Sequence, residues 1–307
     1  MGKINTVNGT IDGSALGRTM MHEHLIVKPQ IDDPKYVPYT LDNAAKSTME
    51  CIEYKTHGGK SIVEMTPINY GRDVDLLQKI AKASKTNILF TTGFHKEEFM
   101  PSYVSSTSTE ELAEIILKEI KDGVGKNCLK PAVIKCGSSF GTITPNEEKC
   151  IRAAGIAHNK SGLPISTHCD KGTMGIEQLD ILQSVGVDPK NVLLGHVDIT
   201  ENTEYVLSLC KRGANVEIDH VGRDLSGKDH VRLDMMAEII RQGFLSQLFL
   251  SGDMGKKDYL YAYGGRPGLT YFLKEFKDLC ARKIGERNYD RIMIDNPKRF
   301  LSDNGQN

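Results

Sequence analysis

The segment Arg18-Thr-Met-Met-His-Glu-His-Leu-Ile-Val27 carries two histidines, His22 and His24, separated by one residue. Successive side chains of an extended strand point to opposite faces, so both imidazoles of such a pair point the same way. Two imidazoles on one face can bind a single metal ion. Surface histidines also occur with this spacing, so the pair predicts a metal site only if the rest of the chain supplies further ligands.

Short apolar or β-branched runs recur along the chain and alternate with longer helical patterns. They predict eight strands, at 19–24, 61–66, 88–93, 132–136, 164–168, 192–196, 214–219 and 248–253. From the first strand end to the last, the repeat averages about 33 residues. One β/α unit of an eight-stranded barrel takes roughly 30 residues. The pattern therefore predicts an α/β fold, a single (β/α)8 TIM barrel over residues 1–307.

Helical patterns with recognisable ends lie between these strands. We expect one helix at 109–122, one with Pro145 at its first position, one starting at Thr200, and one at 229–242 closed by Gly243. The alternative fold is an open, doubly wound sheet. The chain lacks G-x-G-x-x-G after an early strand and lacks G-x-x-x-x-G-K-[ST] altogether, so the phosphate-binding motifs of many such sheets are missing.

The composition narrows the class of partner. Lys plus Arg number 39 and Asp plus Glu number 40, a formal net charge of -1, which argues against nucleic acid and favours a small-molecule substrate. No apolar run approaches roughly 18 residues and no apolar leader is present, so we expect a cytoplasmic protein without a membrane segment. The 7 cysteines show no C-x-x-C spacing and are expected to be reduced and mostly buried. A homodimer is an open alternative to a monomer.

Further side chains able to bind metal follow the ends of predicted strands. The carboxyl ends of barrel strands converge beneath the βα loops, where catalytic groups collect. These ends carry Lys135, His168, His196 and Asp253 in addition to the first histidine pair. Any single histidine among them could be a hydrogen-bonded core residue, but their joint placement favours a metal site. Of the other histidines, His95 and His220 follow strands and could line the pocket.

Together these motifs resemble the phosphotriesterase-like family of the amidohydrolase superfamily over nearly the full length. The matching elements are Gly17-Arg-Thr-Met-Met-His-Glu-His-Leu25, Lys135, His168, Gly195-His-Val-Asp198, Ser251-Gly-Asp253 and Asn296-Pro-Lys-Arg-Phe-Leu301. Members of that family are hydrolases with two metal ions bridged by a carboxylated lysine. The resemblance implies an amidohydrolase-type barrel in which one ion is held by His22, His24 and Asp253. It implies that His168 and His196 hold the second ion and that Lys135 bridges both as N6-carboxylysine.

Such a site implies two divalent ions, zinc being favoured and Mn, Co or Fe being alternatives, together with CO2 for the lysine carbamate. Two ions about 3.5–4 Å apart can share one hydroxide that attacks the substrate, while one ion polarises the carbonyl or phosphoryl oxygen. Asp253 is then the candidate catalytic residue, carrying a proton to the leaving oxygen. Asp198 is expected either to orient a metal ligand or to cap the helix at Thr200. Glu23 is expected to point away from the site.

The loops after the last two strands are basic and contain Arg223, Lys257 and Arg266. Barrel enzymes frequently bind phosphate through these loops, and cationic loops suit phosphate better than an aliphatic acyl chain. We therefore predict a lactonase that opens a small phosphorylated sugar lactone, with these three residues on the phosphate unless they are ordinary solvated charges. His220 and Tyr103 are further substrate-binding candidates, although Tyr103 could simply pack.

Alternative activities within the same family are a phosphotriesterase, a carboxylesterase or an acyl-lactone hydrolase. The family's acyl homoserine lactone enzymes resemble each other in carrying a tyrosine after the third strand, whereas this chain has Gly93-Phe94-His95 there, which argues against that substrate. A remoter alternative is a non-catalytic barrel that binds a sugar phosphate.

Overall fold

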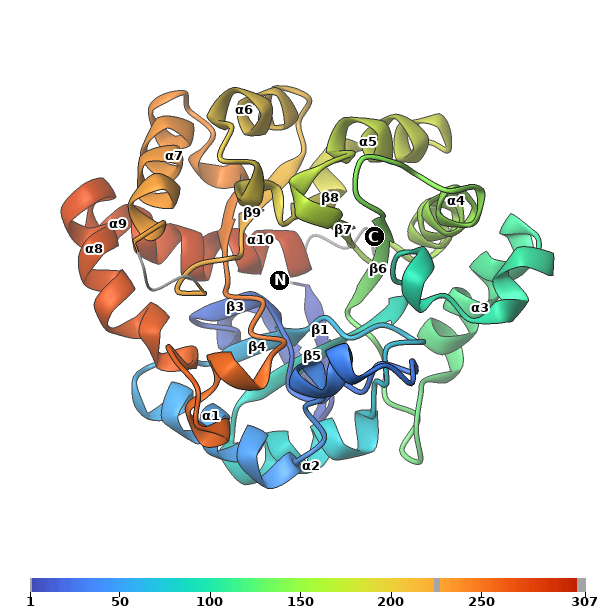
Figure 1. Ribbon diagram of the computed structural model, residues 1–307, viewed down its shortest axis with the longest axis horizontal. Helices are drawn as coiled ribbons and strands as arrows, with labels where there is room; N and C mark the ends of the chain where they lie inside the picture. Colours follow the sequence, from blue (N-terminus) through green and yellow to red (C-terminus); the bar gives the residue numbers. More distant parts are fainter. Residues whose placement is uncertain (1, 224–226, 303–307) are drawn as a thin grey trace.

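Eight parallel strands form the central sheet of the computed structural model, which describes residues 2–223 and 227–302. In spatial order they are β3 (Thr19–Glu23), β4 (Ser61–Glu64), β5 (Asn87–Gly93), β6 (Val133–Ser138), β7 (Ile165–Cys169), β8 (Val192–Gly195), β9 (Asn215–Ile218) and β10 (Leu248–Leu250). Each pairs in parallel with the next. The predicted (β/α)8 barrel is confirmed (Figure 1).

The seam between β3 and β10 closes the barrel through side chains as well as backbone. Asp253 N donates to His22 O over 3.0 Å, while the Ser251 hydroxyl bridges the backbone N and O of His22 at 3.0 and 2.8 Å. A register shift between Met20 and Glu23 interrupts the pairing of β3 with β4. The seam therefore joins the first and last barrel strands at the residues predicted to bind metal.

Helices surround the strands (Figure 1). They are α1 (Ala44–Thr56), α2 (Val74–Ser84), α3 (Thr109–Asp122), α4 (Pro145–Ser161), α5 (Gly175–Ser184), α6 (Thr203–Lys211), α7 (Asp229–Arg241), α8 (Glu275–Ile284), α9 (Glu286–Asp290) and α10 (Asn296–Ser302). No helix in the described ranges is long and apolar enough to cross a membrane. All seven cysteines are free and six are buried, as predicted.

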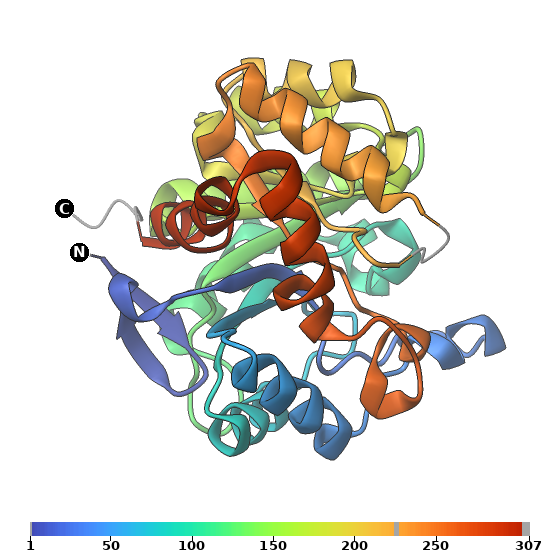
Figure 2. The same ribbon diagram turned by 90° about the vertical axis from the view of Figure 1, so that its left-hand side faces the viewer.

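An antiparallel hairpin that the sequence reading missed precedes the barrel, formed by β1 (Lys3–Thr6) and β2 (Gly9–Asp12). It lies at the same end of the barrel as α10 (Figure 2). Ile4 of the hairpin and Phe300 of α10 belong to one buried apolar cluster with the strand residues Met21, Leu89 and Phe249. Apolar packing thus fills this end of the barrel interior.

Several element boundaries differ from the prediction. Thr144 caps α4, with Pro145 in its first turn, as expected. The helix predicted from Thr200 begins instead at Thr203 with Asn202 as its cap, because the Thr200 hydroxyl donates to Val197 O within a preceding 3₁₀ turn. The predicted sixth and eighth strands are also too long. β8 ends at Gly195, directly before His196, whose φ is 67°, and this left-handed backbone ends the strand. β10 ends at Leu250, and Asp253, with φ of 45°, lies in the loop that follows.

Candidate metal centre

A cavity of about 590 Å³ lies at the carboxyl ends of the barrel strands. All six predicted metal ligands line it: His22, His24, Lys135, His168, His196 and Asp253. The predicted substrate residues His220 and Arg223 also line it. The fold therefore brings together side chains that are up to 231 positions apart in the chain, as the strand-end argument required.

Three predicted substrate residues do not line this cavity. Tyr103 belongs to a 3₁₀ turn, Ser102–Ser106, and is 40% exposed. Arg266 is exposed. Lys257 does not line the cavity, whereas its neighbour Lys256 does. Loop sequence identified the basic character of this wall, but not which neighbouring residue faces the cavity.

The first predicted ligand set is assembled at the β3–β10 seam. His24 Nε2 lies 3.1 Å from Asp253 Oδ1, and His22 Nε2 lies 3.8 Å from the same oxygen. The three side chains offer ligand atoms within 4.8 Å of one another. Opposite Nε2, the Nδ1 atom of His24 is 2.8 Å from the Thr66 hydroxyl, which itself donates to Glu64. This second contact fixes the ring so that Nε2 faces the cavity.

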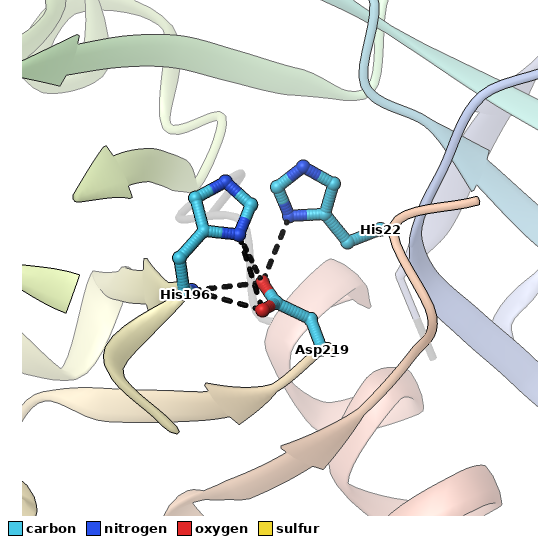
Figure 3. Close-up of side chains that lie close together, drawn as sticks. All are labelled: His22, His196 and Asp219. Atoms are coloured by element: carbon cyan, nitrogen blue, oxygen red, sulfur yellow. Dashed lines mark hydrogen bonds and ion pairs between the residues drawn. The ribbon is translucent and has the colours of Figure 1, made fainter. Parts of the chain in front are cut away.

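Asp219, which follows β9, holds two of the predicted ligands. It lies 3.1 Å from His196 Nδ1 and 3.4 Å from His22 Nδ1 (Figure 3). Its two oxygens also accept the backbone N–H of His196 at 3.0 and 2.9 Å. Burial acts to raise the pKa of Asp219, but His196 and its hydrogen bonds hold that pKa well below the usual range. Asp219 is therefore a buried carboxylate that orients imidazoles toward the cavity.

Sequence reasoning did not single out Asp219 or its neighbour Glu217, whose Oε2 lies 3.3 Å from His22 Nδ1. The available signal was their spacing: Glu217 and Asp219 alternate with the apolar residues Val216 and Ile218 in a predicted strand, and a strand buries such acidic groups only with partners. Asp198 does not cap α6. It accepts from Arg232 Nε at 2.7 Å and lies 3.6 Å from His220 Nδ1.

Lys135 lies inside the barrel on β6 and is 1% exposed. Its Nζ is 3.2 Å from His22 Nε2. Burial lowers the pKa of Lys135, whereas Asp253, Glu217 and Asp219 act to raise it. A lowered pKa increases the fraction of neutral amine, the form that can add CO2 to become a carboxylate ligand.

His168 and His196 are neighbours in space, with ring centroids 4.5 Å apart. His168 Nε2 is buried and has no hydrogen-bond partner among the described residues. A buried polar atom without a partner costs free energy unless a ligand satisfies it. The three-residue groups that contain His196 include Asp219 or His220 rather than His168, so the second predicted set is less compact than the first.

Glu23 turns away from the cavity and holds both neighbours of Asp253. Its Oε1 accepts from Ser251 Oγ and Gly252 N at 2.8 and 2.7 Å, and its Oε2 accepts from Met254 N at 2.9 Å. Burial raises the pKa of Glu23 to about 7 against these donors. The residue between the two histidines is therefore structural, as expected, and it fixes the backbone that presents Asp253.

The buried histidines predict how acid affects the metal-free protein. Burial lowers the pKa of His168 to about 3, from 6.5. Below pH 6.5 this histidine is protonated in the unfolded chain but stays neutral in the folded chain. Its contribution to the free energy of unfolding is therefore full above pH 6.5 and decreases as the pH falls toward 3. One such group contributes a slope of about 1.4 kcal/mol per pH unit. Urea unfolding between pH 7 and 4 measures how the free energy of unfolding depends on pH. This dependence should be weaker in His168→Gln than in the unsubstituted protein, and an equal dependence would contradict the lowered pKa of His168.

Comparison with known proteins shows similarity to one protein family over almost the whole chain. The sequence model of the Phosphotriesterase family matches residues 2–301. The phosphotriesterase homology protein of Escherichia coli (strain K12) is 34% identical over 290 residues, covering 93% of this chain and 98% of that protein. The phospho-furanose lactonase of Mycoplasmopsis agalactiae is 28% identical over 321 residues, covering 97% and 91%. The crystal structure of a lactonase from Listeria monocytogenes matches with a TM-score of 0.93 at 29% identity, covering 97% of this chain and 98% of that one.

Proposed function

The chain belongs to the phosphotriesterase family and is a hydrolase, and from that premise we propose that it is a lactonase dependent on two divalent metal ions. The relatives support assignment as a lactonase, since three of the similar proteins are named as lactonases. The residues of the cavity support the metal reading. The observation that carries the proposal is the common orientation of the histidine rings.

In three rings, those of His22, His24 and His196, the Nδ1 atom contacts an oxygen of another side chain. The lone pair of each Nε2 is thereby left for a ligand. The buried Nε2 of His168 has no hydrogen-bond partner in the described chain, and Asp170 Oδ1 lies 3.8 Å from it. This donor set suits two divalent ions: His22, His24 and Asp253 would hold one, His168 and His196 would hold the other, and Lys135, as a carbamate, would supply an oxygen ligand to both. Zinc is the favoured ion. Bound ions supply Lewis-acid polarisation of the substrate carbonyl and lower the pKa of water.

Asp253 is proposed to carry the proton to the leaving oxygen. Burial acts to raise its pKa, but the Arg223 guanidinium, at 2.6 Å, holds the pKa well below its usual range. His220 Nε2 lies 3.9 Å from the same carboxylate oxygen. The low pKa keeps Asp253 ionised at neutral pH and means that a protonated Asp253 releases its proton readily, so a proton taken from the attacking water would pass on to the leaving oxygen.

A phosphorylated sugar lactone is the proposed substrate. The M. agalactiae relative is named as a phospho-furanose lactonase, and the cavity wall contributed by the loops after β9 and β10 carries Arg223 and Lys256. Lys256 Nζ stands 5.7 Å from the Tyr39 ring centre and 5.9 Å from that of Tyr259. We propose that Arg223 and Lys256 bind the phosphate. Lys257 and Arg266, which do not line the cavity, would act only from outside it.

The test is a panel of five- and six-membered lactones with and without phosphate, plus one phosphotriester. The protein is first reconstituted with zinc and bicarbonate and its metal counted by elemental analysis. We expect about two ions per chain and the highest kcat/KM for a phosphorylated lactone. Lys256→Met should raise KM about tenfold for that substrate, or 1.4 kcal/mol, and leave unphosphorylated lactones unchanged.

Arg266→Met is the matched control in the same loop and should have a smaller effect. Preferential turnover of the triester would favour the phosphotriesterase alternative. Well under two ions together with no hydrolysis would favour a non-catalytic barrel, and equal loss on all lactones in Lys256→Met would contradict the phosphate assignment.

A further inference from the structure

Six aromatic rings form a closed circuit around the cavity. The centroid distances are His22–His24 5.8 Å, His24–Tyr70 6.2 Å, Tyr70–His95 4.8 Å, His95–His168 4.6 Å, His168–His196 4.5 Å and His196–His22 4.8 Å. Four of these rings are proposed metal ligands. The remaining two, Tyr70 and His95, follow β4 and β5, neighbouring strands that carry none of the proposed ligands. They fill the gap between His24 and His168.

Backbone contacts fix both residues in place. Tyr70 N donates to Pro67 O, and Tyr70 O accepts from Lys28 N. His95 follows Gly93, whose φ is 95° and where a Cβ would lie 2.1 Å from Lys135 O. Phe99 packs against both rings, at 4.6 Å from Tyr70 and 4.8 Å from His95. The pair is therefore held rigidly with apolar backing.

The hydrogen bonds of His95 determine which nitrogen carries its proton. Its Nδ1 lies 2.7 Å from Lys96 N, and a backbone N–H can only donate. The ring proton is therefore on Nε2. A metal ion would need the lone pair of Nε2 and would force the proton onto Nδ1, against the Lys96 N–H. The contact with Lys96 thus makes His95 a donor toward the cavity and not a metal ligand.

Tyr70 supplies a second donor beside it. Neither its hydroxyl nor His95 Nε2 takes part in a hydrogen bond with another described residue. Both residues line the cavity and are largely buried. Two adjacent donors of this kind match one acceptor oxygen, and donors in a site that limits water access stabilise negative charge that develops on such an oxygen.

We propose that Tyr70 and His95 form a two-donor subsite that binds an acceptor oxygen of a carbonyl or phosphoryl substrate next to the metal centre. This inference rests on the proposed hydrolase function and goes beyond it by assigning substrate orientation to strands without metal ligands. Both residues were outside the predicted substrate set, because only the paths of the two loops after β4 and β5 bring their rings together.

The test compares Tyr70→Phe, His95→Leu, His95→Gln and the double variant Tyr70→Phe/His95→Leu on the best lactone. Loss of either donor should lower kcat/KM about 10- to 100-fold, and the double variant should lose less than the product of the single losses, because both donors bind one oxygen. His95→Gln keeps an N–H donor and should retain most activity. Tyr205→Phe, which removes a phenol hydroxyl bonded to Gly175 N, is the control and should match the unsubstituted protein.

Metal content and binding provide independent readouts. All variants should keep the same number of ions; loss of metal in His95→Leu would make His95 a ligand and overturn the inference. Calorimetric binding of 4-hydroxybutanoate, the product of a five-membered lactone, should weaken in Tyr70→Phe and His95→Leu. Unchanged activity and binding in Tyr70→Phe would also overturn it. If the unsubstituted protein hydrolyses no lactone but binding weakens in the variants, the proposed function fails and the subsite stands.

Discussion

Replacing Lys135 by alanine is expected to lower kcat by at least about 10³-fold, or about 4 kcal/mol of transition-state stabilisation. Lys135 is buried among three carboxylates that act on its charge and lies beside His22 Nε2. Without its carbamate, no oxygen ligand would span the two proposed ion positions, and the metal content should fall to one ion or fewer. Elemental analysis and steady-state kinetics of the same preparation measure both effects.

Rescue by a small carboxylate would separate the ligand role of Lys135 from a packing role. The alanine variant leaves a buried space, and propionate added with zinc should restore part of the metal content and activity by placing a carboxylate there. Lys130→Ala removes an exposed lysine and is the control for loss of a positive charge. Two ions and full activity in Lys135→Ala would contradict the carbamate proposal.

Replacing Glu23 by alanine is expected to cost about 3 kcal/mol of unfolding free energy. The substitution leaves the backbone N–H groups of Gly252 and Met254 without a partner, whereas the Ser251 hydroxyl can still donate to His22 O at 2.8 Å. Each buried unsatisfied group costs about 1–3 kcal/mol, reduced where the backbone relaxes or water enters. Urea unfolding of the metal-free protein at pH 7 measures the loss.

Two further variants test whether the loss comes from the Glu23 carboxylate. Glu23→Gln keeps one carbonyl oxygen but turns an amide N–H toward one of the donors, so it should lose about 1–2 kcal/mol. Glu110→Ala removes an exposed glutamate and should stay within about 0.5 kcal/mol. Because the Glu23 carboxylate holds both neighbours of Asp253, Glu23→Ala should also weaken metal binding. A stability loss no larger than that of Glu110→Ala would show that the seam does not depend on this carboxylate.

Local sequence predicted the barrel and the side chains that meet in its cavity because both follow from periodicity. Strand-like runs recurring at barrel spacing place every strand end on one rim, and the histidines, lysine and aspartate at those ends must then meet. The exact ends were less predictable. His196 and Asp253 follow their strands in left-handed conformation, and Thr200 turns back on Val197, because local hydrogen bonds compete with regular elements in ways that a pattern does not record.

The sequence by itself determined the fold class and the set of side chains that line the candidate metal centre, since these depend on repeat length and on residue type at strand ends. Tertiary structure alone decided which residues surround them. Asp219 orients His22 and His196, and Glu23 holds the backbone beside Asp253. Lys256 rather than Lys257 faces the cavity, and Tyr70 contacts His95. These contacts join residues from different strands and loops. Their existence depends on the angle at which each chain segment leaves the barrel, which is set by packing and not by neighbours in sequence.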